Sequence, residues 1–133
     1  MGKSALFLSL LAFAAPAMAQ RAQADMECRH TGTDFIYDCA IHIKRGGEPL
    51  SGAKVTVGAD MPSMPMAHNI KPVTAKPGKT PGEYRAQLDL EMTGEWALKL
   101  RLSGAVRDVL VLHYEFDERG ARRVRQTRTP PRK

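Results

Sequence analysis

The strict alternation of apolar and polar residues between positions 84 and 102 most constrains the fold of this chain. Apolar side chains occupy every second position in two runs separated by Thr93-Gly94: Tyr84, Ala86, Leu88, Leu90 and Met92, then Trp96, Leu98, Leu100 and Leu102. A period of two places one face of a strand in a core and the other face in water. The two runs therefore predict a β-hairpin whose inward faces share one core.

Shorter runs with the same spacing extend this interpretation along the chain. Residues 35–43 alternate between apolar or Cys positions and polar ones, and residues 53–57 place two valines on one face. The continuous apolar run 109–112 is typical of a central strand covered on both faces. No segment of ten or more residues has helical spacing. The sequence predicts an all-β fold, an immunoglobulin-like antiparallel β-sandwich of about six or seven strands.

The two ends of the chain differ in composition from this body. Lys3, the apolar run that follows it and small residues before Gln20 have the form of a secretory signal peptide, which we expect to comprise residues 1–19. The apolar run is too short for a membrane span. Residues 20–118 are predicted to form one sandwich domain, and residues 119–133 a basic, disordered tail. The mature protein is therefore expected to be soluble and periplasmic.

The formal net charge of +6 is unevenly distributed along the chain. Seven basic residues lie in the tail, so that residues 20–118 carry 12 basic and 14 acidic residues. The tail is interpreted either as a solvated end without a specific role or as a segment attracted to anionic lipid head groups or an acidic partner. It has no aromatic residues on which bases could stack, and no nucleic-acid partner is expected.

Cys28 and Cys39 are the only cysteines of the chain. An exported protein meets oxidising conditions, which favour a disulfide between them. The alternative is a pair of thiolate metal ligands, but the ten residues between the two cysteines do not form a compact chelating motif. We therefore expect the pair to be structural.

A methionine-rich segment, residues 60–68, contains the most specific candidate site. Met61, Met64, Met66 and His68 lie within eight residues, and two prolines exclude a regular helix that would point all three thioethers into a core. Thioether sulfur is a soft, uncharged ligand that selects Cu(I), and imidazole also suits copper. The alternatives are packing of the methionines against the sandwich and a His68 that is merely solvated.

Met92 is a further candidate thioether ligand, because it ends an inward strand face and so lies at one end of the sandwich. Its spacing does not decide whether the methionine-rich segment shares that end, and core packing is the alternative. His30, His42 and His113 are expected not to be ligands. Met26 lies near the mature N-terminus, where fraying is expected.

The order Met61-Pro62-x-Met64-x-Met66-x-His68, then Gly82-Glu83-Tyr84, then Met92-x-Gly94-x-Trp96-x-Leu98 resembles the YtkA-like (FixH-like) domain. The resemblance covers about residues 45–112, and the cysteine pair and the basic tail lie outside it. It implies a small exported or membrane-anchored β-sandwich with a periplasmic role in copper handling. It also implies that the loop with Met64 and His68 converges with Met92 at one end of the sandwich.

The predicted function is that of a periplasmic Cu(I)-binding protein that buffers or transfers copper. The expected metal ligands are Met61, Met64, Met66, His68 and Met92. A protein donor or acceptor in the periplasm or inner membrane is the expected partner. The alternative is a non-catalytic interaction module of a membrane complex, with the methionine-rich segment as its contact surface. An enzyme is not expected, because the chain has no paired carboxylates, Ser-His-Asp spacing or phosphate-binding loop.

Overall fold

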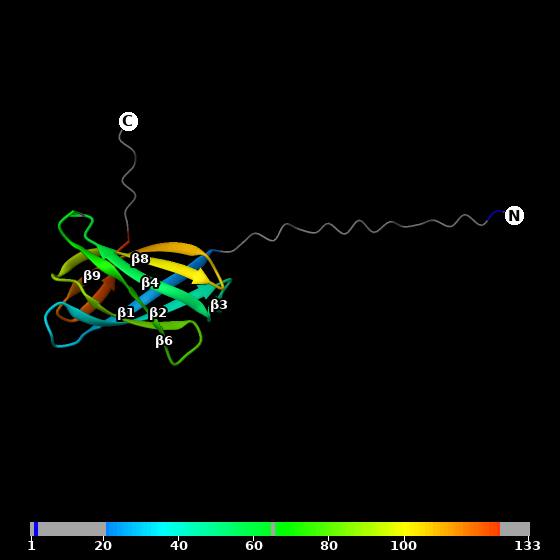
Figure 1. The fold of residues 1–133 in the computed structure, drawn as a ribbon, viewed down its shortest axis with the longest axis horizontal. Helices are drawn as coiled ribbons and strands as arrows, with labels where there is room; N and C mark the ends of the chain where they lie inside the picture. The colour runs from blue at the N-terminus through cyan, green and yellow to red at the C-terminus, as the bar shows by residue number, and fades with distance from the viewer. Residues whose placement is uncertain (1, 3–20, 65, 126–133) are drawn as a thin grey trace, which may run out of the picture.

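The computed structural model describes residue 2, residues 21–64 and residues 66–125, which form two five-stranded antiparallel sheets (Figure 1). The first sheet has the order β1-β2-β7-β6, with β3 paired to β2, and consists of β1 (Ala22–His30), β2 (Ile36–Arg45), β3 (Glu48–Pro49), β6 (Lys76–Pro77) and β7 (Glu83–Asp89). The second has the order β10-β9-β8-β4-β5 and consists of β4 (Ala53–Asp60), β5 (Asn69–Thr74), β8 (Gly94–Gly104), β9 (Asp108–Asp117) and β10 (Gly120–Arg123).

The core lies between the inward faces of the two sheets, and this confirms the predicted all-β sandwich. Its fully buried side chains alternate along the strands, as in Tyr37, Cys39, Ile41 and Ile43 of β2, and in Trp96, Leu98, Leu100 and Leu102 of β8. Trp96 also donates a hydrogen bond from its indole nitrogen to the Met92 carbonyl oxygen, 3.1 Å away. The expected signal peptide, residues 1–19, lies outside the described residues except for Gly2.

The predicted hairpin of residues 84–102 is wrong, although its two strands do share one core. β7 pairs with β2 and β6, whereas β8 pairs with β4 and β9 in the other sheet. The turn of residues 90–93 carries the chain from one sheet to the other, with left-handed backbone at Glu91 and Gly94 flanking Met92. Alternation reports which side chains face the core, but it does not report which strand lies alongside.

The run 109–112 in β9 is not covered on both faces, contrary to expectation. Leu112 is buried and Leu110 is half-buried, whereas Val109 and Val111 are 43% and 51% exposed. The strand therefore has one core face and one apolar outer face.

Five strands lie where the sequence analysis assigned none: β1, β3, β5, β6 and β10. Met26 does not fray, because it is buried in β1 and its backbone nitrogen donates to the Tyr114 hydroxyl oxygen at 2.8 Å. The folded body also continues beyond residue 118, since β10 pairs with the end of β9. Residues 126–133 of the expected disordered tail lie outside the described part of the chain.

The expected disulfide is present and joins Cys28 of β1 to Cys39 of β2. The two cysteines are directly opposite one another in the ladder between these strands. Cys39 is buried in the core and Cys28 packs against it, so the bridge stiffens the edge of the first sheet.

Gly120 fixes how closely β10 approaches this bridge. Its φ is +144°, and a Cβ there would lie 2.5 Å from the Cys28 carbonyl oxygen. We expect Gly120→Ala to lower the free energy of unfolding by about 1–3 kcal/mol, because backbone must move to relieve the clash. Urea denaturation measures this loss. Gly47→Ala is the control, since Gly47 has a φ of +77° but open space around its Cβ position; an equal loss there would assign the effect to backbone conformation alone.

Candidate metal site

The methionine loop, residues 61–68, projects from one end of the sandwich between β4 and β5. In Figure 1 it is the green segment at the upper left, at the end opposite to the entry of the chain into β1. Backbone hydrogen bonds close it: Met61 N donates to His68 O at 3.0 Å, and the amides of Met64 and His68 donate to the carbonyls of Met61 and Met64 at 3.0 and 3.1 Å. The loop is therefore held at its base and folded on itself.

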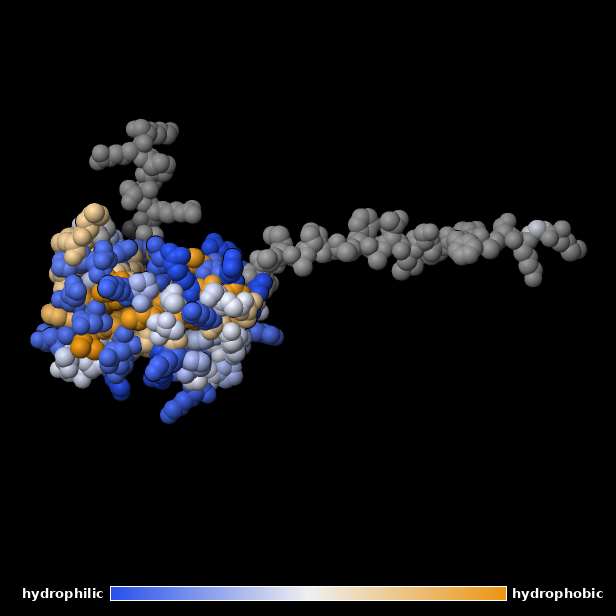
Figure 2. Space-filling model, viewed as in Figure 1, coloured by the Kyte–Doolittle hydropathy of each residue, from blue (hydrophilic) through white to orange (hydrophobic). Residues whose placement is uncertain are grey.

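The three methionines of this loop have different surroundings. Met61 is 4% exposed and belongs to the core, where its terminal methyl lies 3.1 Å from the position that a Cβ of Gly94 would occupy. Met64 is 40% exposed and Met66 is 94% exposed. Figure 2 shows the loop as a pale orange projection from a mostly blue surface. The thioethers of Met64 and Met66 are therefore accessible to a metal ion from solvent. The side chain of Met61 packs in the core at the base of the loop.

His68 closes the methionine loop and faces the neighbouring turn. Its side chain is 30% exposed, but its Nδ1 atom is buried and accepts or donates no hydrogen bond. That nitrogen lies 3.9 Å from Oε2 of Glu91. A carboxylate on the Nδ1 side favours the tautomer with the proton on Nδ1, which leaves the lone pair on Nε2.

Met92 follows Glu91 in the turn that carries the chain between the sheets. Its side chain is half-buried and packs against the core. The turn and the methionine loop lie at the same end, because Glu91 approaches His68 and Gly94 approaches Met61. The structure thus brings Met92 to the end that holds the loop, a placement that the spacing of residues alone could not give.

A family model described as YtkA-like matches residues 23–101. The chain belongs to the YtkA-like family. The match spans more than half of the chain and includes the methionine loop and Met92. It also includes Cys28 and Cys39, so the expectation that the cysteine pair lies outside the family region is wrong. No curated protein and no solved structure matches the chain.

The other histidines of this YtkA-like chain lie outside the methionine loop and the neighbouring turn. His30 accepts a hydrogen bond from Gly32 N at 3.0 Å, and His42 lies on the outer face of β2. His113 is 11% exposed and lies 3.6 Å from Glu95. Within the described ranges, no three side chains of His, Cys, Asp or Glu gather closely enough to hold a metal ion. Among the residues that the structure describes, no helix has the length and apolarity needed to cross a membrane.

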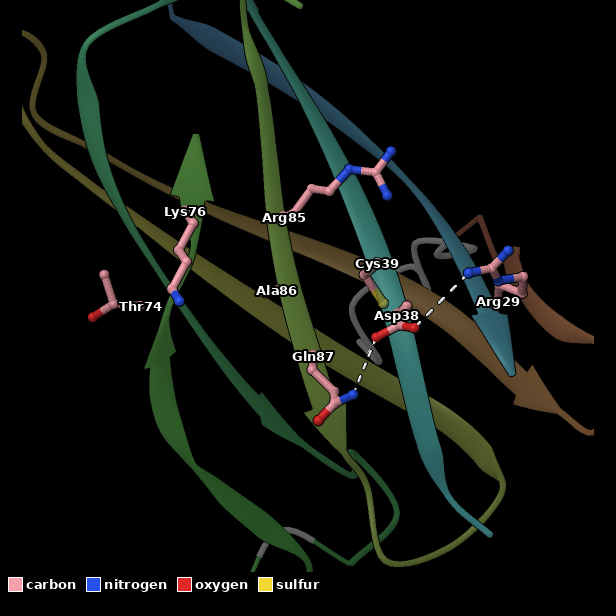
Figure 3. A pocket seen from close by; sticks show the side chains of 8 residues that line it. All are labelled: Arg29, Asp38, Cys39, Thr74, Lys76, Arg85, Ala86 and Gln87. Atoms are coloured by element: carbon pink, nitrogen blue, oxygen red, sulfur yellow. Dashed lines mark hydrogen bonds and ion pairs between the residues drawn. The ribbon is translucent and has the colours of Figure 1, made fainter. Parts of the chain in front are cut away.

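A hollow on the outer face of the first sheet was not foreseen from the sequence. Its lining is mostly polar: Arg29, Asp38, Cys39, Thr74, Lys76, Arg85, Ala86 and Gln87. Arg85 extends from β7 across β2, while Arg29 and Gln87 turn toward Asp38 (Figure 3). Arg29 and Gln87 lie 4.0 and 3.2 Å from the Asp38 carboxylate. Arg29 and Asp38 therefore engage one another in this hollow, which contains no thioether.

One buried carboxylate organises the opposite end of the sandwich. Glu83 accepts hydrogen bonds from the Thr80 hydroxyl and the Arg85 guanidinium, each at 2.8 Å. The Thr80 hydroxyl, followed by Arg85, holds the pKa of Glu83 below its ordinary value, against the opposing effect of burial. The backbone nitrogen of Gly78 also donates to the Glu83 carbonyl at 2.7 Å. The hydrogen bonds around Glu83 thus hold this end of the sandwich together, and it has no methionine.

Proposed function

We propose that this YtkA-like protein is a periplasmic Cu(I)-binding protein that uses the methionine loop to buffer or transfer copper. The observation that carries the proposal is the exposure of Met64 and Met66, 40% and 94%, on a loop whose backbone is closed by hydrogen bonds. Side chains this exposed contribute little to packing. Their sulfur atoms are soft donors, and Cu(I) is the metal that soft thioethers select.

The proposed donors are Met64, Met66, His68 and Met92. The first two present sulfur to solvent, and His68 adds one nitrogen beside them. Met92 completes the set from the neighbouring turn, where it is half-buried. Met61, which the sequence analysis placed among the ligands, is assigned to packing because it is 4% exposed. The atoms proposed to bind the metal are therefore uncharged, which suits a monovalent soft ion.

Glu91 is proposed to orient His68 for metal binding. Ligating histidines usually donate their second ring N–H to a carboxylate, which fixes the tautomer and the plane of the ring. The buried Nδ1 of His68 has no hydrogen-bond partner and lies 3.9 Å from Glu91. A small rotation of the exposed Glu91 side chain would close this distance when Nε2 binds the metal.

The proposed activity is ligand exchange without catalysis. Thioethers bind copper without losing a proton, so only His68 makes the affinity depend on pH, and protonation of its imidazole weakens binding. An acceptor can replace the donors one at a time because Met64 and Met66 are reached from solvent. A protein acceptor or donor with its own soft ligands is the corresponding partner.

A competition titration tests the proposal directly. The exported form, residues 20–133, is titrated against a chromophoric Cu(I) chelator under mild reductant. We expect the protein to withdraw one Cu(I) per chain. A chain that withdraws none under conditions where it remains folded would contradict the proposal.

Glu91→Gln is expected to lower the Cu(I) affinity by about 10-fold, at the lower end of the range for outer-shell partners of ligating histidines. The same competition titration measures the change. Glu95→Gln is the matched control, because Glu95 lies 3.6 Å from His113 on β9, in a similar His–Glu pair outside the methionine loop. An equal loss in both variants would show that the effect comes from net charge and not from the orientation of His68.

A second candidate function is that of an interaction module with the methionine loop as its contact surface. The 94% exposure of Met66 favours it, because an apolar side chain on a projecting loop can insert into a partner. Partner binding that depends on Met64 and Met66 in the absence of copper would favour this function over metal binding.

A further inference from the structure

The outer face of β9 carries exposed apolar side chains that the proposed copper site does not use. Among the described residues the exposed large hydrophobic side chains are Met64, Met66, Val109 and Val111. Two of these belong to the methionine loop. The other two are neighbours on the outer face of β9, where they are 43% and 51% exposed.

Positive charge flanks the two valines on the side of β8. Arg101 is directly opposite Val109 in the ladder between β8 and β9, and Lys99 is directly opposite Val111. Both cationic side chains are exposed. Within the described residues, neither forms an ion pair. Their charges are therefore available to an external anion.

The opposite side of β9 borders a groove at the edge of the second sheet. A groove along this edge is lined by Val111, Leu112, His113, Arg123, Val124 and Arg125. Val124 continues the pairing of β10 with β9, since its nitrogen donates to the His113 carbonyl at 2.8 Å. Arg123 is opposite the inward-facing Tyr114 and donates to the Ala24 carbonyl at 3.5 Å, so the cationic strip beside the valines is that of Lys99 and Arg101.

Three acidic side chains near this ridge are engaged with other groups, whereas Asp60 lines the hollow that also contains Lys99 and Arg101. Glu95 lies 3.6 Å from His113, and Glu115 lies 2.7 Å from Arg122. Asp108 accepts a hydrogen bond from Ala22 N at 3.2 Å and lies 3.7 Å from Arg21. Among the described residues, Lys99 and Arg101 thus remain without an ion-pair partner beside the valines.

We propose that this β9 face, defined by Lys99, Arg101, Val109 and Val111, binds the surface of an anionic membrane. Cations that attract anionic head groups, together with aliphatic side chains that enter the boundary of the acyl chains, are the two components of peripheral membrane binding. An acidic protein would match the charge, but the exposed apolar side chains of the ridge are valines, which are under-represented among the residues that dominate protein interfaces.

The start of the folded chain lies beside the β9 face. Ala22, which follows the predicted export signal, is hydrogen-bonded to Asp108, the neighbour of Val109. The methionine loop is at the other end of the strands, so membrane contact through this face leaves the loop accessible. The proposal does not depend on copper binding.

Vesicle co-sedimentation tests this proposal with the exported form, residues 20–133. We expect binding to vesicles of phosphatidylcholine mixed with phosphatidylglycerol, loss of binding at high salt, and no binding to vesicles of phosphatidylcholine alone. The double variant K99Q/R101Q should bind about 10- to 30-fold more weakly, because each cation near an anionic surface contributes about 1 kcal/mol and 1.4 kcal/mol is tenfold. V109T/V111T should bind at least about 3-fold more weakly than the wild type.

The matched control is R29Q/K76Q, which removes the same charge from the outer face of the first sheet. Circular dichroism checks that each variant is folded. Equal losses in the control and in K99Q/R101Q would overturn the proposal in favour of net charge. Unchanged binding of K99Q/R101Q would overturn it in favour of the tail, which every variant keeps. Absence of vesicle binding together with binding to soluble polyglutamate would overturn it in favour of an acidic protein partner.

Discussion

Replacement of Met64 and Met66 by leucine is expected to lower the Cu(I) affinity by at least about 100-fold, because two sulfur atoms that bind the metal are removed together; loss of a residue that only orients a ligand costs about 10- to 100-fold. The free energy of unfolding of the metal-free protein should change by no more than about 0.5 kcal/mol, since both side chains are exposed. Leucine keeps the size and the apolar character of the side chain. The change therefore isolates the sulfur atoms.

Two measurements separate the outcomes of this double substitution. A competition titration with a chromophoric Cu(I) chelator gives the affinity, and urea denaturation of the metal-free chain gives the stability. Met26→Leu is the control, because Met26 is buried in β1 and its sulfur has no role in the proposed site. The affinity should be unchanged in this control. Equal affinities of the wild type and M64L/M66L would show that the exposed thioethers do not bind copper, and would leave the contact-surface function.

The two-residue period predicted which side chains face the core more reliably than it predicted the neighbours of each strand. The inward faces of β2, β7 and β8 follow the alternation, because a buried apolar face is a local property of a strand. Pairing is not local. The turn of residues 90–93 crosses between sheets, and the sequence contains no feature that distinguishes this crossing from a hairpin turn.

The sequence contained an unused signal for the position of Met61. Val55, Val57 and Ala59 alternate as inward residues of β4, and Met61 is the next position in the same series. The prolines after Met61 favour an irregular loop, but Met61 itself continues the alternation of inward residues of β4. Extending the alternation by two steps would have separated Met61 from Met64 and Met66.

The approach of Glu91 to His68 could not be predicted from the sequence. The two residues belong to different loops, and their proximity depends on the pairing of β4 with β8 and on the crossing between sheets. The exposed face of β9 was obscured for a different reason. A run of four apolar residues occurs both in strands covered on both faces and in strands whose outer valines meet solvent or a partner. The sequence pattern therefore does not distinguish the two.

Met61→Ala is expected to lower the free energy of unfolding by about 2–5 kcal/mol, in contrast to the exposed methionines of the same loop. Met61 is 4% exposed and its terminal methyl lies against Gly94, so truncation leaves a cavity where β4 meets the start of β8. The loss is measured by urea denaturation. Met66→Ala is the control, because a 94% exposed side chain should cost no more than about 0.5 kcal/mol.

Met61→Leu distinguishes packing from metal binding at this buried position. Leucine conserves the volume, so the loss of stability should stay below about 1.5 kcal/mol. The Cu(I) affinity of this variant should equal that of the wild type, because the hydrogen bond from Met61 N to His68 O keeps the base of the loop closed. A fall in affinity as large as that of M64L/M66L would instead make Met61 a ligand. The core would then open when copper binds, and the metal-loaded protein would differ in structure at β4 from the metal-free one.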